Sequence, residues 1–327
     1  MNPLLKITNL SISFKTYRGI LEAIHNVSLD VQEGETVGIV GESGCGKSVT
    51  SQAVMKLLPE STTQYTSGAI YWQGTDILPL SESQMNTLRG RDMAMVFQDP
   101  MTALNPVLTI GDQVCESLRR VQRVSKGEIK KKAIDLLRAV GITSPEKRFY
   151  QYPHELSGGM RQRSLIAMAL AGQPKLLFAD EPTTALDVTT EAQILALLQQ
   201  LQQHTGMAMI LISHNLGIIA QMCRRIYVMY AGTVVETGTA EDIFYRPIHP
   251  YTKGLLASLP DPAHKDKLLT GIEGQAPDLF HMPRGCRFFR RCLYAMKICI
   301  HKLPPVYEAD AGHQVSCWLL SPERKCV

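Results

Sequence analysis

A glycine-rich loop brings a lysine and a hydroxyl to the start of a helical pattern. Residues 41–48 read Gly-Glu-Ser-Gly-Cys-Gly-Lys-Ser. The apolar, β-branched residues 36–40 before the loop are typical of a buried strand, and residues 48–58 after it suit a helix. In this context Lys47 is expected to reach the β- and γ-phosphates of a nucleotide, and Ser48 to ligate Mg²⁺.

The remaining loop residues serve the same chemistry through their backbone. Glycines allow conformations that a side chain would forbid, so successive N–H groups can converge on phosphate oxygens. The helix N-terminus adds a favourable dipole for the anion. The predicted nucleotide-binding residues are Gly41, Glu42, Ser43, Gly44, Cys45, Gly46, Lys47 and Ser48. A thiol at this position could be redox-active, but a small side chain that fits the loop is the simpler reading of Cys45.

Two adjacent carboxylates follow a second buried-strand pattern. Residues 175–180 are mostly apolar and end in Asp180-Glu181. Alternation along a strand points neighbouring side chains in different directions. We therefore assign Asp180 to Mg²⁺ and Glu181 to the attacking water, as general base.

Two further polar residues lie close to these carboxylates in the sequence. Ala185-Leu186-Asp187 follows almost at once, and the apolar residues 207–212 end in Ser213-His214. The carboxyl ends of strands in one α/β sheet are where ligands collect, so His214 is a further site candidate.

The chain resembles the ATP-binding cassette (ABC) ATPases over about residues 4–260. The resemblance rests on Gly41–Ser48, Gln98 in Val-Phe-Gln-Asp-Pro, Leu156–Gln162 (Leu-Ser-Gly-Gly-Met-Arg-Gln), Asp180-Glu181 and His214, in the family's order and spacing. It implies an ATPase whose cofactors are ATP and Mg²⁺.

Roles for individual residues follow from the resemblance. Gln98 is expected to contact Mg²⁺ and the attacking water, and His214 the γ-phosphate. Asp187 belongs to the motif that follows the catalytic carboxylate. The signature residues Ser157, Gly158, Gly159 and Gln162 are expected to cap an ATP held by the opposite subunit, which implies a dimer that closes over two ATPs. An aromatic residue near the N-terminus is expected to stack on adenine, either Phe14 or Tyr17, with Phe14 favoured.

The fold class expected is α/β. A P-loop NTPase (RecA-like) core over residues 36–58, 92–98 and 160–230 would carry an antiparallel β layer from residues 4–36 and 67–75. Residues 101–158 are mainly helical, with Gly141 and Pro145 as breakers, and end at the signature. We predict an ATPase domain at 4–260 and a small irregular metal-binding extension at 261–327.

Composition places the chain among ordinary globular proteins. It has 327 residues, 45% of them hydrophobic, and a net charge of +4 that gives no indication of nucleic-acid binding. The N-terminus lacks a secretory signal, and residues 204–223 read as strand, loop and helix start and not as a membrane span.

Four cysteines are grouped near the C-terminus. Cys286, Cys292, Cys299 and Cys317 give the spacing C-x5-C-x6-C-x17-C. Without an export signal, clustered thiols indicate metal before disulfides. The spacing lacks the paired cysteines that are typical of zinc ribbons. Arginines and lysines lie around the cysteines in the sequence. The candidates are therefore an iron–sulfur cluster and zinc, with free thiols as a third possibility.

This tail resembles the C-terminal extension of the peptide and nickel importers among the ABC ATPases. The matching stretches are His249–Leu256, Gly285–Phe288, Arg291-Cys292 and Gly312–Trp318. In that subfamily the four cysteines are associated with a [4Fe–4S] cluster. The two histidines in the region, His301 and His313, are not needed as ligands.

The resemblance implies an ATPase subunit that energises import of di- or oligopeptides from the cytoplasmic face of the bacterial cell membrane. Its partners would be two transmembrane permease subunits, a second ABC ATPase (commonly a distinct paralogue) and, indirectly, a solute-binding protein. A nickel chelate is an alternative cargo. A DNA-repair ATPase would carry a long coiled coil between loop and signature, whereas residues 49–156 contain no heptad run; an exporter would have no evident use for the tail.

Overall fold

The computed structural model describes residues 2–122, 125–184, 186–258 and 271–322. The chain forms two compact units, and each is described by itself. Unit 1 comprises Met1–Asp30, Val37–Leu78 and Ser213–Val327, and unit 2 comprises Val31–Thr36 and Pro79–Ile212. Within the described residues, none of the helices combines the length and apolar content needed to cross a membrane.

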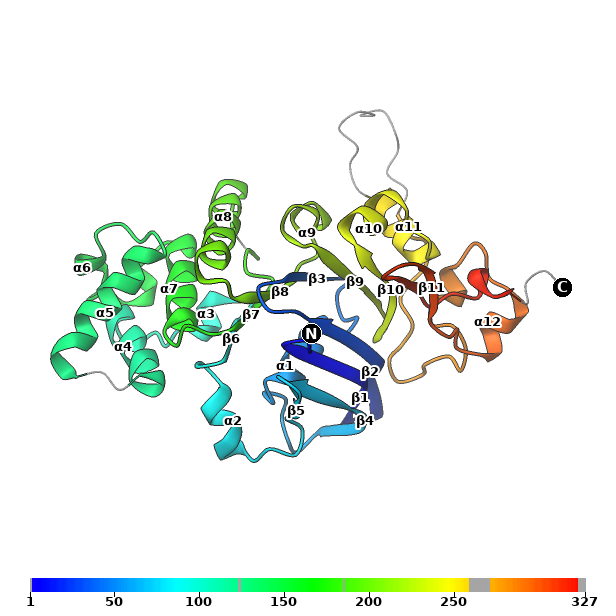
Figure 1. Ribbon diagram of the computed structural model, residues 1–327, viewed down its shortest axis with the longest axis horizontal. Helices are drawn as coiled ribbons and strands as arrows, with labels where there is room; N and C mark the ends of the chain where they lie inside the picture. Colours follow the sequence, from blue (N-terminus) through cyan, green and yellow to red (C-terminus); the bar gives the residue numbers. More distant parts are fainter. Residues whose placement is uncertain (1, 123–124, 185, 259–270, 323–327) are drawn as a thin grey trace. The chain divides into compact units, whose positions relative to one another are not determined.

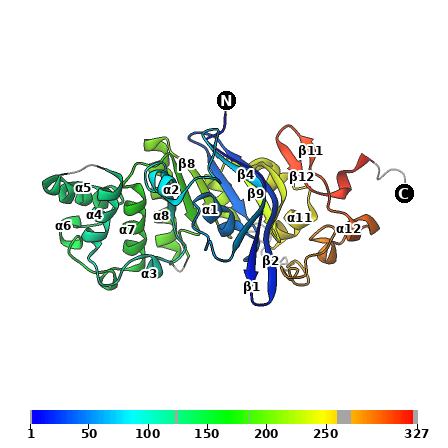
Figure 2. The ribbon, with the colours of Figure 1, turned by 90° about the horizontal axis from the view of Figure 1, so that it is seen from below.

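An antiparallel layer forms one part of unit 1 (Figure 2). Its strands are β1 (Leu5–Thr16), β2 (Gly19–Val31), β4 (Thr63–Trp72) and β5 (Thr75–Asp76), in the order β2-β1-β4-β5. Strand β4 is antiparallel to both β1 and β5. Apolar residues such as Ile7, Ile12 and Ile70 are buried, so this layer contributes to the core of unit 1.

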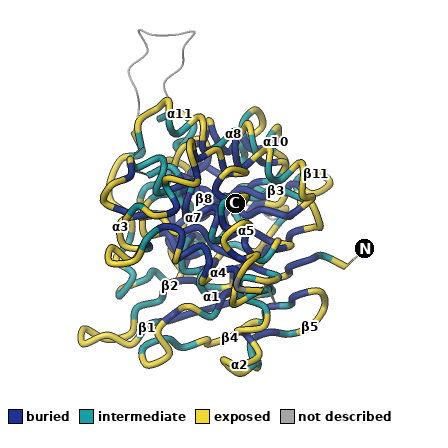
Figure 3. Tube along the Cα trace, turned by 90° about the vertical axis from the view of Figure 1, so that its left-hand side faces the viewer, coloured by how far each residue is buried: buried dark blue, intermediate teal, exposed yellow. Residues whose placement is uncertain are grey.

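The second sheet of unit 1 carries the glycine-rich loop. Its strands are β3 (Thr36–Val40), β9 (Arg225–Tyr230), β10 (Thr233–Thr239), β11 (Tyr307–Asp310) and β12 (His313–Val315). Strands β3 and β9 are parallel, while β10 is antiparallel to both β9 and β12. Helices in this part are α1 (Lys47–Val54), α9 (Leu216–Met222), α10 (Ala240–Tyr245) and α11 (Pro250–Ala257). Strand β3 is buried along most of its length (Figure 3).

The C-terminal residues belong to unit 1. They form η2 (Phe289–Arg291), α12 (Lys297–His301) and η3 (Trp318–Leu320) besides β11 and β12. Because β12 pairs with β10, with Glu236 opposite Val315, the extension continues the sheet that carries the loop (Figure 1). The boundary predicted at residues 260 and 261 lies outside the described residues.

Unit 2 combines a parallel sheet with a group of helices. Its strands are β6 (Met93–Val96), β7 (Leu176–Asp180) and β8 (Ala208–Ile212), with β7 paired to both neighbours in parallel. Every residue of these strands is buried. The helices are α2 (Glu82–Leu88), α3 (Pro100–Ala103), α4 (Ile110–Val121), α5 (Lys126–Ala139), α6 (Pro145–Arg148), η1 (Pro153–Glu155), α7 (Gly158–Leu170) and α8 (Val188–Thr205).

Two helix predictions differ from the structure at their ends. The helix predicted over residues 48–58 ends at Val54, because Lys56 adopts a left-handed backbone with φ 48°. Pro145 does not break a helix but begins α6. A backbone N–H at this first helical position would have no intrahelical acceptor, so its absence in proline costs no hydrogen bond. In α8, Ile194, Leu197 and Leu198 are buried and form an apolar face, whereas Leu201 is half-buried.

Candidate functional site

The glycines of the phosphate loop are required by both conformation and space. Gly41 and Gly46 have φ values of 150° and 101°, in the region that favours glycine. A Cβ added to Gly41 would lie 2.1 Å from the carbonyl oxygen of Met229, and one on Gly46 would lie 2.6 Å from Ile24. Any side chain at these two positions would therefore displace the loop from β9 or β2.

Lys47 is the first residue of α1 and is buried. Its Nζ donates to the carbonyl oxygens of Gly41 and Glu42, at 2.8 and 3.0 Å. These two bonds hold the ammonium group against the loop that should bind the phosphates. Ser48 follows in the first turn of α1, where no acidic side chain competes for a cation or repels a phosphate.

Cys45 is part of the packing of the loop. Its side chain is buried, and burial raises the pKa of the thiol, against the opposing effect of Lys47. A buried thiol with a raised pKa is a poor nucleophile. The geometry therefore supports the reading of Cys45 as a small side chain that fits the loop.

Glu42 links the loop to two distant segments of unit 1. Its backbone N–H donates to the hydroxyl of Tyr251 at 2.9 Å. Its carboxylate oxygens lie 2.9 and 3.0 Å from Nη1 of Arg291. Tyr251 and Arg291 are not among the predicted site residues, because both come from segments more than 200 residues away along the chain.

The other predicted site residues of unit 1 are exposed or partly exposed. His214 precedes α9, whose N-cap is Asn215. Phe14 lies near the end of β1, opposite Thr63 of β4, and is half-buried. Tyr17 is 98% exposed in the turn between β1 and β2.

In unit 2 the structure brings Gln98 and Glu181 together. The amide Nε2 of Gln98 donates to Oε2 of Glu181 at 3.0 Å. The hydroxyl of Thr184 donates to the same oxygen, also at 3.0 Å. A carboxylate fixed by two donors is well placed to orient a water molecule as a general base. Thr184 was missed in the sequence, where nothing distinguishes it from any other threonine in a turn.

Asp180 and Glu181 differ in burial, but strand alternation is not the reason. Asp180 is the last residue of β7 and is 4% exposed, whereas Glu181 lies beyond the strand. The backbone of Glu181 is left-handed, with φ 44°, and its N–H donates to the carbonyl of Ile212 at 2.9 Å. A turn immediately after the strand thus separates the two carboxylates.

The signature residues begin helix α7. Ser157 is the N-cap, and its hydroxyl accepts from the N–H of Met160. A Cβ on Gly159 would lie 2.5 Å from Thr190 of α8, so glycine permits close packing there. Gln162 is 1% exposed. Ser157 is accessible for a contact with ATP, whereas Gln162 lies in the interior of unit 2.

Asp187 is the N-cap of α8. Its carboxylate accepts from the backbone N–H of Thr190 at 2.9 Å and from the hydroxyls of Thr189 and Thr190. These hydrogen bonds, above all that from Thr189, lower the pKa of Asp187. The residue therefore stays ionised at the positive end of the helix dipole.

The four clustered cysteines all lie in the extension, and none of the described cysteines forms a disulfide. Burial, with a smaller effect of neighbouring thiols in the group, raises the pKa of Cys286 to about 12 and that of Cys317 to about 11. The N–H of Cys286 donates to the carbonyl of Cys299 at 2.8 Å. In the described part of the chain, however, no three His, Cys, Asp or Glu side chains form a group that could hold a metal ion.

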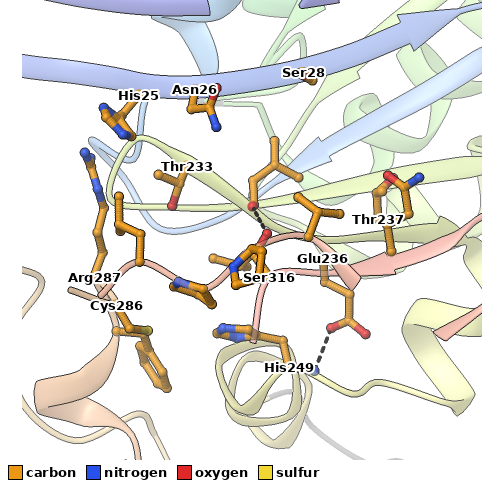
Figure 4. A pocket seen from close by; sticks show the side chains of 18 of the residues that line it. His25, Asn26, Ser28, Thr233, Glu236, Thr237, His249, Cys286, Arg287 and Ser316 are labelled. Carbon is orange, nitrogen blue, oxygen red and sulfur yellow. Dashed lines mark hydrogen bonds between the residues drawn. The ribbon is translucent and has the colours of Figure 1, made fainter. Parts of the chain in front are cut away.

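A small cavity of about 190 Å³ lies in unit 1 between β10, β2 and the extension (Figure 4). Glu236, His249, Cys286 and Arg287 are on its wall. Glu236 is buried and accepts from the backbone N–H of His249 at 3.1 Å, while His313 Nε2 lies 2.8 Å from its other oxygen. The cavity is smaller than the roughly 300 Å³ of small-molecule sites, and no residue of the phosphate loop lines it.

Family models match most of the chain. The ABC transporter model matches residues 24–184, and the model of the oligopeptide/dipeptide transporter C-terminal region matches residues 235–299. The second match includes Cys286, Cys292 and Cys299.

Curated relatives are similar along nearly the whole chain. The sequence is 52% identical over 321 residues to the oligopeptide transport ATP-binding protein OppD of Bacillus subtilis. The aligned region covers 98% of this chain and 90% of that protein. It is 51% identical over 319 residues to the dipeptide transport ATP-binding protein DppD of the same organism, covering 98% and 95%.

Solved structures show the same fold. A dimeric post-hydrolysis structure of the ATP-binding cassette MJ0796, bound to ADP and Pi, is 30% identical, with a TM-score of 0.65 over 72% of this chain and 98% of that one. The structure of cbiO1 from Clostridium perfringens is 27% identical in sequence to this chain and has a TM-score of 0.64. The match covers 75% of this chain and 92% of that one. The predicted P-loop α/β fold is confirmed, and the chain belongs to the ABC transporter ATPases of the oligopeptide/dipeptide type.

Proposed function

We propose that this ATPase energises the import of di- or oligopeptides. The observation that carries the proposal is the extent of the similarity: relatives named as oligopeptide and dipeptide transport proteins match through the C-terminal extension and not only through the cassette. Residues 4–260 would form the ATPase part, and residues 261–327 an extension specific to this type of transporter.

The partners follow from the same proposal. Two permease subunits would form the path through the membrane, and a solute-binding protein would deliver the peptide. A second ABC ATPase, commonly a distinct paralogue, would complete the pair. The chain would then be peripheral, on the cytoplasmic face of the bacterial cell membrane.

The residues of this chain divide the work of hydrolysis. In unit 1, the loop Gly41–Ser48 would bind the phosphates, with Lys47 transferring its hydrogen bonds from loop carbonyls to phosphate oxygens. In unit 2, Gln98 and Thr184 hold Glu181 in one orientation, in which it would take the proton of the attacking water. The hydroxyl of Ser48, the carboxylate of Asp180 and the amide oxygen of Gln98 are oxygen donors of the kind Mg²⁺ prefers.

A second copy or a paralogue would complete the site. Ser157 and Gly158 begin α7, and a helix N-terminus with an exposed hydroxyl suits a γ-phosphate. We propose that this end of α7, with Gly159, caps an ATP held by the partner ATPase. Phe14 would stack on its own adenine, with Tyr17 as the alternative, and His214 would contact the γ-phosphate.

We further propose a [4Fe–4S] cluster on Cys286, Cys292, Cys299 and Cys317, with zinc as the alternative. Support comes from the common location of the four cysteines in the extension, where their thiols are near enough to raise one another's pKa. When bound, the cluster would cross-link an extension that has little apolar core of its own.

The metal is tested by anaerobic purification of the full-length chain and analysis of iron, sulfide and zinc. About four irons and four sulfides per chain are expected for the cluster. One zinc, or no metal, would contradict it without affecting the assignment of the ATPase.

Transport is tested in a strain that lacks this gene. Restoring the wild-type gene should restore uptake of a labelled dipeptide and tripeptide, whereas Lys47→Ala should not, since its loop cannot hold ATP. Uptake of a nickel chelate in place of peptides would replace the peptide assignment with the alternative cargo. Normal uptake of both the peptides and the nickel chelate without the gene would overturn both assignments.

A further inference from the structure

The C-terminal extension contacts the phosphate loop directly through Arg291. The side chain of Arg291 is only 7% exposed, and its Nη1 lies 2.9 Å from Oε2 and 3.0 Å from Oε1 of Glu42. The same guanidinium donates to the carbonyl oxygens of Glu273 at 3.0 Å and Ile272 at 3.1 Å, and to the hydroxyl of Tyr230 at 3.3 Å. Arg291 is therefore held by the extension and by β9 before it reaches the loop.

An aromatic cluster packs next to the contact between Arg291 and Glu42. Tyr230, Tyr251 and Phe288 have ring centroids 4.6 to 5.5 Å apart. The hydroxyl of Tyr251 accepts from the N–H of Glu42, and Phe288 comes from the extension. Glu42 is thus fixed at both its backbone and its carboxylate by groups that pack on one another.

A second arginine of the extension acts on the turn beside the loop. Arg287 is buried and donates to the carbonyl oxygen of Ala231 at 2.5 Å, and its other nitrogen lies 2.9 Å from Glu22. The next residue, Gly232, donates its N–H to the carbonyl of Cys45 in the loop at 2.9 Å. Figure 4 shows Arg287 and Cys286 beside each other on the wall of the cavity.

The charge of Glu42 explains why this support matters. A carboxylate in a loop that binds a triphosphate repels its ligand unless a cation neutralises it. Arg291 supplies that cation, with Glu42 30% exposed and Arg291 largely desolvated. Such a charge-assisted contact also fixes the loop backbone before ATP arrives, which reduces the entropy lost on binding.

We propose that Arg291 is a positioning residue for ATP: by pairing with Glu42 it neutralises and orders the phosphate loop, so the extension forms part of the nucleotide site. The proposal rests on the assignment of Gly41–Ser48 as that site. It predicts a change in ATP affinity and in KM, with little change in kcat, because the contacts of Arg291 are with the phosphate loop and not with the proposed general base.

The test is equilibrium binding of Mg-ATP, with KM and kcat, in the full-length chain. Arg291→Gln should raise the Kd and KM for ATP about tenfold, the loss of one charge-assisted contact. Arg290→Gln is the matched control: Arg290 is exposed, lies over the ring of Phe289 and precedes Arg291 in the same turn. It should change the Kd by no more than about twofold. Arg291→Lys, which keeps the charge but not the fork of donors, should give an intermediate Kd.

The double variant separates a contact through Glu42 from a general loss of structure. In a Glu42→Gln background, Arg291→Gln should raise the Kd by only about twofold, because the carboxylate it neutralises is gone. An equal tenfold loss in both backgrounds, an unchanged Kd in Arg291→Gln, or an equal loss in Arg290→Gln would each overturn the proposal. Lys47→Ala tests the site itself: normal ATP binding by that variant would refute the assignment of the loop independently of Arg291.

Discussion

The carboxylate of Glu181 owes its position to a backbone turn and two side-chain donors. A left-handed residue directly after β7, with its N–H bonded to Ile212 of β8, turns the side chain out of the strand. Gln98 follows β6 and Thr184 follows in the same turn as Glu181, and both donate to one carboxylate oxygen. A carboxylate held in one orientation in this way can accept the proton of a water molecule.

Glu181→Gln should remove hydrolysis while leaving ATP binding intact. The amide keeps the shape of the side chain but is too weak a base to take a proton, so kcat should fall by about 10²- to 10³-fold. ATP binding and steady-state phosphate release report the two effects, and the variant should accumulate as an ATP-bound closed dimer. Glu191→Gln, which loses a carboxylate bonded to Thr183 in the same region, is the control. Steady-state hydrolysis near the wild-type rate would remove Glu181 as the base.

Thr184→Val should lower kcat without changing ATP affinity. The substitution keeps the volume of the side chain but removes one hydrogen bond to Glu181, worth about 1 kcal/mol, so kcat should fall by about fivefold. A Kd for ATP that rises as much as kcat falls would show that Thr184 supports nucleotide binding and does not orient the base.

Sequence motifs identified the residues whose chemistry depends on local spacing. Lys47, Glu181 and Ser157 each lie in a short run with a typical order, and the structure places each at the end of a strand or the start of a helix. No sequence motif identified Thr184 and Arg291 as site residues, because their roles arise from tertiary contacts. Gln162 lies within the signature run but is buried, since helical periodicity turns its side chain toward the core.

At the scale of elements, helix α11 depends on an unusual cap. The Nδ1 of His249 accepts from the N–H of Tyr251 at 3.0 Å, and Pro250 occupies the first turn. A ring nitrogen accepts only while the imidazole is neutral. His249 is 1% exposed, and burial lowers its pKa to about 3. The sequence could not indicate this role, because His249 is not among the usual capping residues.

The cap makes stability depend on pH in a defined window. The folded pKa of His249 lies below the ordinary value of about 6.5, so the unfolded chain binds the extra proton more readily. Its contribution is complete above about pH 6.5 and declines as the pH falls toward about 3.

His249→Asn should make stability less sensitive to acid. Asparagine can cap the helix but does not titrate in this range, so the fall in the free energy of unfolding between pH 7 and pH 5 should be about 2 kcal/mol smaller than in the wild type. Urea unfolding at the two pH values measures it. His301→Asn, at an exposed histidine of α12, should leave the fall unchanged, and an equal fall in His249→Asn would show that the cap does not titrate.

At the scale of the whole molecule, the extension is built into unit 1. Strand β12 pairs with β10, His313 contacts the buried Glu236, and Arg291 contacts Glu42 of the loop. The sequence predicted an irregular appendage because strands as short as β11 and β12 leave no periodic pattern. Their partner strand lies many residues earlier, so only tertiary structure shows that the tail completes the sheet beside the nucleotide loop.

This integration sets the expected effect of a cysteine substitution in the extension. Cys292→Ser should lower the melting temperature of the full-length chain and raise the KM for ATP several-fold, because Cys292 follows Arg291 directly and loosening this turn releases Glu42. The kcat at saturating ATP should remain within about twofold of the wild type, since the residues around Glu181 are unaffected. Cys115→Ser, at a buried thiol of α4 in unit 2, is the control for loss of a packed sulfur and should leave KM unchanged. A fall in kcat with KM unchanged would mean that the extension acts on the chemical step and not on the phosphate loop.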